Sequence, residues 1–117
     1  MDRVPAEQEN FKVVHGADVV PSFPEPGLTR RVGAFNSKLC LVEHRMEKGW
    51  VGAAHAHPHE QVVYVAQGHL KVTCEGQTVD IRAGDSFVVV GGLEHQASAV
   101  EESLVIDIFT PCRKDYA

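Results

Sequence analysis

The chain has 117 residues, 44% hydrophobic and 23% charged, a balance that fits one globular domain and excludes a disordered segment or a coiled coil. A formal charge of −5, with scattered lysines and arginines, excludes nucleic acid and a membrane surface as partners. No apolar run approaches the ~18 residues of a membrane span, and we expect neither a signal peptide nor a membrane span, so the predicted location is cytoplasmic.

The N-terminal part is predicted to be an arm. Residues 1–31 contain four of the six prolines and little sustained periodicity, although FKVV at 11–14 is compatible with a short edge strand. We therefore expect residues 1–31 to wrap the domain or a partner, and residues 32–117 to form the domain itself.

The remaining segments indicate short β-strands. VGAF at 32–35, a turn at 36–37 and LCLVEHRM from 39 predict a hairpin. The stretch 68–92 alternates β-rich segments with turns at 75–76 and 84–85, and a further strand is expected at 104–109. Since no long helical period occurs, eight or nine strands predict an all-β, antiparallel, single-domain sandwich or small barrel.

The three cysteines predict neither a disulfide framework nor a thiolate zinc site. Cys40, Cys74 and Cys112 are odd in number, far apart and without metal-binding spacing. Cys40 and Cys74 lie in apolar strand patterns, where a cysteine is usually a small buried hydrophobe.

The segment 49–61, GWVGAAHAHPHEQ, carries the densest chemistry in the chain. His55 and His57 are two positions apart, so on a strand both would leave the same face about 6–7 Å apart and could converge on one metal ion. Pro58 is expected to end that strand. Gln61 then opens the apolar run QVVYVAQ and is expected to face the histidine pair.

Two spaced motifs resemble the signatures of the cupin family over about residues 38–110. The first comprises Gly49, His55, His57, Gln61 and Gly68, with Gln61 in the place usually held by glutamate. The second comprises Gly84, Val90, Gly92 and His95, with Val90 in place of proline and, farther on, Ala99 in place of asparagine. The resemblance implies a cupin jelly-roll barrel, or double-stranded β-helix, that holds one divalent metal ion on His55, His57, Gln61 and His95.

Such a ligand set has a chemical consequence. Three neutral imidazoles and a neutral amide leave the ion's full charge in the cavity, which suits Lewis-acid isomerisation or ring opening. Imidazole ligation accommodates Ni, Fe, Mn, Zn or Cu, and the sequence does not choose among them. His59 is expected at the rim of the site, whereas His15, His44 and His69 lack partners at ligand spacing and are left outside it.

The C-terminal segment VIDIFTPCRKDY at 105–116 resembles the closing segment of small pectin-degradation cupins of the KdgF type. That resemblance implies Asp107 as an acid/base, Phe109 as a wall for substrate and Arg113 as a clamp for a uronate carboxylate. Strand parity supports an inward Asp107 and Phe109, because Ile106 and Ile108 share the other, apolar face. An Asp107–Arg113 salt bridge that fastens the C-terminus is the structural alternative.

These features together predict a homodimeric, metal-dependent enzyme that opens or isomerises a 4,5-unsaturated uronate or a similar small sugar acid. One alternative is a cupin dioxygenase with the same three-His, one-Gln site. Another is a non-catalytic cupin that binds a sugar or other small ligand at the metal.

Overall fold

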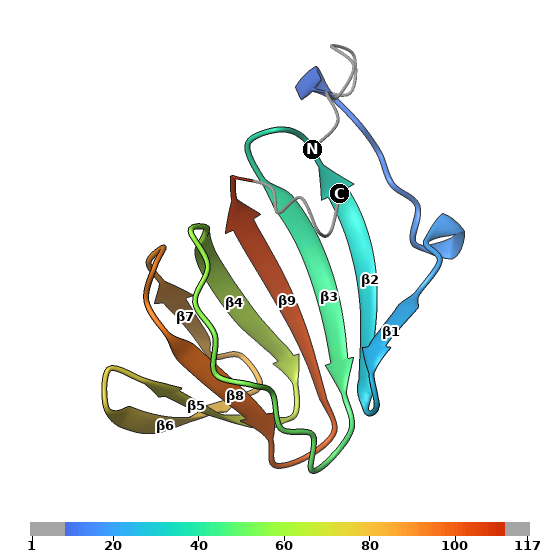
Figure 1. The fold of residues 1–117 in the computed structure, drawn as a ribbon. Coiled ribbons are helices and arrows are strands. Elements are labelled where there is room, and N and C mark those ends of the chain that lie inside the picture. The colour runs from blue at the N-terminus through green and yellow to red at the C-terminus, as the bar shows by residue number, and fades with distance from the viewer. Residues whose placement is uncertain (1–8, 112–117) are drawn as a thin grey trace.

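The computed structural model describes residues 9–111, which form two antiparallel sheets packed face to face (Figure 1). The larger sheet has the order β1 (Ser22–Glu25), β2 (Leu28–Phe35), β3 (Cys40–Met46), β9 (Ser103–Thr110), β4 (Glu60–Gln67) and β7 (Ser86–Val89). The smaller sheet has the order β6 (Gln77–Arg82), β5 (His69–Cys74) and β8 (His95–Ala99), and a 3-10 turn spans Gly16–Asp18. The predicted all-β sandwich is confirmed.

Alternating side chains explain why these segments form strands around one core. On β3 and β9 every second residue is buried, as the period of two in a strand requires. The core between the sheets joins Val63, Val65 and Val105 of the larger sheet to Leu70 and Val72 of the smaller one. Burial of these side chains is the main force that holds the sheets together.

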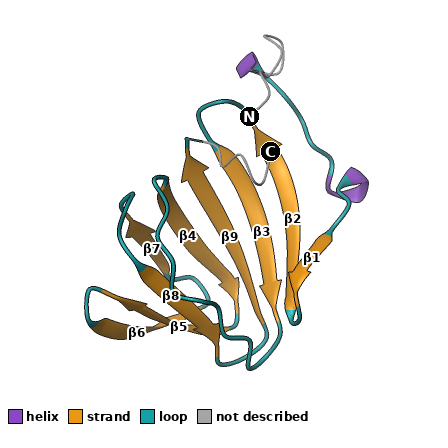
Figure 2. Cartoon of the chain, in the orientation of Figure 1, coloured by secondary structure: helices purple, strands orange, loops and turns teal. Residues whose placement is uncertain are grey.

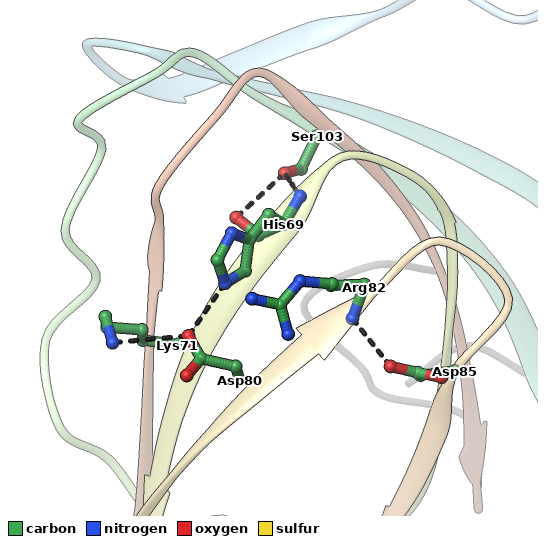
Figure 3. Close-up of polar contacts among 6 residues, drawn as sticks. All are labelled: His69, Lys71, Asp80, Arg82, Asp85 and Ser103. Atoms are coloured by element: carbon green, nitrogen blue, oxygen red, sulfur yellow. Dashed lines mark hydrogen bonds and ion pairs between the residues drawn. The ribbon is translucent and has the colours of Figure 1, made fainter.

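A polar network fastens the start of β5 to the neighbouring strands (Figure 3). The buried Ser103 hydroxyl accepts a hydrogen bond from the backbone N–H of His69, while the His69 ring lies 2.7 Å from Asp80 on β6. Lys71 approaches the same carboxylate oxygen at 3.2 Å, and His69 and Lys71 together hold the pKa of Asp80 below its usual value. Since Ser103 contacts the backbone of His69 and not its ring, these residues do not form a nucleophilic triad.

The outer face of the larger sheet carries an exposed apolar row. Leu41 on β3 pairs with Ile108 on β9, which pairs with Val62 on β4, which pairs with Val88 on β7. All four side chains are exposed. The outward direction of Ile108 agrees with the strand parity predicted for β9.

The N-terminal segment differs from its predicted structure. Residues 11–14 form no strand, and the sheet edge is instead occupied by β1, while β2 begins at Leu28 rather than at 32. Figure 2 shows that the segment preceding β1 runs along the β2 edge. Contacts hold it there, since Arg31 donates to the carbonyl of Gly16 and the amide of Asn36 donates to the carbonyl of Glu9.

The sequence predicts no membrane-spanning segment. Among residues 9–111, no helix is long and apolar enough to cross a membrane.

The close approach of β5 and β9 generates a test of the fold. Gly68 has a φ of +98°, and a Cβ atom there would overlap the backbone of Glu102 and Ser103. Gly76 has a φ of +76°, but nothing lies within 4 Å of its Cβ position. Gly76→Ala is therefore expected to lower the unfolding free energy by about 1–2 kcal/mol through backbone strain alone. Gly68→Ala adds the steric overlap and should lower the unfolding free energy by more than Gly76→Ala does. Urea titration of both variants measures the difference, and equal losses would contradict the packing described here.

Candidate metal centre

The connection between β3 and β4 brings the two histidine motifs together by pairing with β8. Backbone hydrogen bonds join Gly49 to Ala99 and Gly52 to Ala97, and His55 exchanges both of its backbone hydrogen bonds with His95. The connection thus lies along the edge of the smaller sheet as an irregular extra strand. The regular strand expected at His55 and His57 is not formed, because only Val51 and His55 make isolated bridges.

Three imidazoles converge at this place. His55, His57 and His95 each offer one ligand atom, and these atoms lie within 4.8 Å of one another. His57 and His95 are buried and His55 is exposed, so the cluster has one open side. Burial and the neighbouring histidines lower the pKa of His95, which keeps its ring neutral and able to bind a cation.

The backbone fixes how the three rings point. Nδ1 of His55 lies 3.2 Å from the carbonyl of Ala53, Nδ1 of His57 lies 3.0 Å from that of His59, and Nδ1 of His95 lies 3.0 Å from that of Leu93. A carbonyl only accepts, so Nδ1 of His55 and of His95 carries the proton and Nε2 of each presents a lone pair. Nε2 of His95 is buried without a hydrogen-bond partner among the described residues, which is the state expected of a ligand atom.

Gln61 lies against the same cluster, with its amide oxygen toward the histidines and its amide nitrogen toward Asp107. Its amide nitrogen donates to Asp107 at 2.7 Å, so its Oε1 faces Nε2 of His57 at 3.0 Å. His57 thus faces an acceptor oxygen at both ring nitrogens, and a neutral imidazole carries only one proton. The second contact therefore needs another proton or a metal ion between the two atoms. A separation of about 3 Å is also what two adjacent ligands show when each lies ~2.1 Å from an octahedral ion. The residues present therefore fit a divalent metal.

Asp107 is the buried carboxylate beside this cluster. It is 4% exposed, and its second oxygen lies 2.7 Å from Nδ1 of His44. His44 in turn accepts a hydrogen bond from Nε of Arg30 at 3.0 Å. Arg113 lies outside the described residues, as does Cys112, so the Asp107–Arg113 bridge stays untested and the partners seen for Asp107 are His44 and Gln61.

A cavity of about 290 Å³ connects these groups to solvent. One part of its wall is polar and includes His55, His95, Gln61 and Asp107. The sandwich core supplies an apolar part that includes Leu70, Val72 and Phe87. Phe109 is 1% exposed, lines the cavity and lies edge-on to the His57 ring with centroids 5.6 Å apart. Its role as a wall for substrate stays a prediction.

His44 is the site residue that the sequence interpretation missed. The sequence offers His44 no partner at metal-ligand spacing. The signal available was strand parity, since Cys40, Val42, His44 and Met46 occupy alternate positions and all face inward. His69, which has no such partner in the sequence either, pairs with Asp80 away from the cluster. His59 contributes its carbonyl to the orientation of His57.

Comparisons with known proteins agree with this fold and site. The Cupin domain family model matches residues 42–109, and the chain belongs to this family. The pectin degradation protein KdgF of Dickeya dadantii (strain 3937) is 34% identical over 92 residues, which cover 77% of this chain and 84% of that protein.

Two solved structures are similar over nearly the whole chain. KdgF from Halomonas sp. is 35% identical with a TM-score of 0.86, covering 92% of this chain and 99% of that one. An RmlC-like cupin from Shewanella frigidimarina NCIMB 400 is 34% identical with a TM-score of 0.87, covering 94% of this chain and 99% of that one. The predicted jelly roll and the predicted resemblance to KdgF-type cupins are thereby confirmed.

The geometry predicts which histidines bind metal. Replacing both His55 and His57 by alanine removes two of the three convergent imidazoles, so stoichiometric binding of a divalent ion should be lost. Mass-spectrometric metal analysis of dialysed protein measures this. His69→Ala is the matched control, because it removes a histidine that pairs with Asp80 and should leave the metal content unchanged.

The same variant tests whether metal is needed for folding. The core between the sheets consists of apolar side chains and contains none of the three histidines, so the double variant should keep its β-sheet circular dichroism, unlike a zinc finger without metal. Full retention of metal, or loss of the fold, would contradict this assignment.

Proposed function

We propose that this cupin is a metal-dependent enzyme that opens the ring of a 4,5-unsaturated uronate, as its similarity to KdgF suggests. The observation that carries the proposal is Asp107, a buried carboxylate that lines the same cavity as His55 and His95 of the histidine cluster. An ionisable group of this kind is costly to bury and is therefore often kept for chemistry or for binding.

The reaction is an isomerisation that needs proton transfer and no redox partner. The hydroxyl at carbon 1 loses its proton, the bond from carbon 1 to the ring oxygen breaks, and the ring oxygen takes up a proton, so that an aldehyde and an enol result. The enol hydroxyl then loses its proton while carbon 4 gains one, which gives the ketone. A divalent ion held by His55, His57, His95 and Gln61 would act as a Lewis acid toward the substrate's oxygens.

The protein's own residues would supply the remaining functions. A carboxylate has about four lone-pair sites, and two hydrogen bonds to Asp107 leave others for a substrate proton. Phe109 would pack against the sugar ring, and Arg113 would bind the uronate carboxylate through its planar guanidinium. A cavity of about 290 Å³ lies at the small end of ligand pockets and suits a single sugar acid rather than an oligosaccharide.

The proposal predicts turnover of 4,5-unsaturated galacturonate that depends on Asp107. The substrate's ultraviolet absorption should disappear and the open-chain product should appear in NMR spectra. Asp107→Asn, measured at saturating metal, should reduce turnover by about 10²- to 10⁴-fold, the scale of a lost general acid or base. Asp80→Asn removes an exposed carboxylate and is the matched control.

Other outcomes separate the alternative functions. Oxygen consumption by the iron-loaded protein, with oxidised product, would replace the proposal by a dioxygenase. Binding of the sugar acid without turnover would replace it by a binding protein. Activity of Asp107→Asn per folded molecule equal to that of the unaltered protein would remove Asp107 from the reaction.

The homodimer expected from the sequence is proposed here as well. The row formed by Leu41, Ile108, Val62 and Val88 would be covered if two copies packed their larger sheets together. Light scattering should then give twice the mass of the chain, and Val62→Glu on β4 should halve it. A single-chain mass for the unaltered protein would contradict the dimer.

A further inference from the structure

Four polar side chains cross the inner side of the larger sheet as one hydrogen-bonded chain. Arg30, His44, Asp107 and Gln61 come from β2, β3, β9 and β4, which are neighbours in that order. The proposed reaction uses Asp107 and the metal ligand Gln61. Arg30 and His44, at the other end of this hydrogen-bonded series, have no role in that reaction.

The strand register explains how residues 14 to 63 positions apart meet. Arg30 lies directly opposite His44. Asp107 lies opposite Val42 on one side and Val63 on the other, so His44 and Gln61 are its diagonal neighbours. Diagonal positions on one face are within reach of long polar side chains. The alternation of strands therefore places a donor on each side of the carboxylate.

The direction of every hydrogen bond in this chain follows from its arginine. A guanidinium only donates, so Nε2 of His44 must be the acceptor and its Nδ1 must carry the proton. That proton is donated to Asp107, which leaves its other oxygen to accept from the amide nitrogen of Gln61. The amide oxygen of Gln61 then faces His57.

We infer that Arg30 and His44 are positioning residues for the metal centre, which act through Asp107 to hold the Gln61 amide with its oxygen toward the ion. An amide oxygen is a metal ligand, whereas an amide NH₂ group has no lone pair to offer. If the amide turned round, the fourth ligand would be lost although Gln61 stayed in place. Hydrogen-bond partners of this kind typically change metal affinity by about 10- to 100-fold.

Variants at His44 test the inference through the affinity for Co²⁺, measured by competition with a chelator. His44→Leu removes the donor to Asp107 and should weaken binding about 10- to 100-fold. His44→Asn should keep affinity close to that of the unaltered protein, because its amide nitrogen stands where Nδ1 of histidine stands. The visible absorption of bound Co²⁺ should change with His44→Leu and not with His44→Asn, since it reports the ligand set.

A second His–Asp pair elsewhere in the protein, outside this hydrogen-bonded series, provides the matched control. His69 and Asp80 are also 2.7 Å apart, but they lie on the smaller sheet (Figure 3). His69→Leu should therefore leave both the Co²⁺ affinity and the Co²⁺ spectrum unchanged.

A double-variant cycle decides whether His44 acts through Gln61. In a Gln61→Ala background there is no amide to hold, so adding His44→Leu should cause no further loss of Co²⁺ affinity. An equal loss with and without the amide would overturn the inference, as would unchanged affinity in His44→Leu.

Arg30→Met supplies a test that leaves the buried histidine in place. It removes the donor that fixes the His44 tautomer and should also weaken Co²⁺ binding, again only when Gln61 is present. If His44→Leu does not fold, this variant decides alone, and an affinity equal to that of the unaltered protein would overturn the inference. Because every measurement uses metal and no substrate, failure of the proposed sugar-acid reaction would not affect the result.

Discussion

The site depends on the backbone pairing between the β3–β4 connection and β8. This connection is too irregular to be a strand, yet its hydrogen bonds to β8 place His55 directly beside His95, 40 positions away. A further hydrogen bond, from Gly92 to the carbonyl of His57, holds the two histidine loops together. The three rings then need no side-chain network among themselves, because backbone carbonyls orient each of them. Backbone contacts thus bring the three imidazole rings together and orient them.

The polar chain across the larger sheet is harder to explain by stability alone. Burying a carboxylate costs several kcal/mol, and two hydrogen bonds to a charged group return about 1.5–3 kcal/mol each. Apolar residues of similar size at His44 and Asp107 would pack against Val42 and Val105 without that cost. We therefore interpret this series of hydrogen-bonded side chains as fixing the orientation of its members, which apolar side chains cannot do. Its position, ending on Gln61 beside the histidine cluster, indicates what is being oriented.

The fold could be predicted from the sequence because buried and exposed side chains alternate along the strands and the turns contain glycines. Cys40 to Met46 and Ser103 to Thr110 show the period of two directly, and Asp107 and Phe109 were placed correctly inside from parity. Two features were not accessible. The pairing of Arg30, His44 and Asp107 depends on the order β2-β3-β9-β4, which local pattern does not contain. The irregular backbone at His55 depends on its partner β8 and not on its own propensity.

The presence of Asp107 gives a physical reason for glutamine at position 61. A glutamate there would bring its carboxylate to where the Gln61 amide nitrogen now lies, 2.7 Å from an oxygen of Asp107. At an effective dielectric constant of ~20, two unit charges at that distance repel by about 6 kcal/mol. An amide avoids this repulsion, since it donates to the anion on one side and presents an oxygen on the other. With Gln61 as the proposed ligand, a metal ligand and a buried anion can be neighbours. The negative charge then lies one hydrogen bond away from the ligands instead of being one of them.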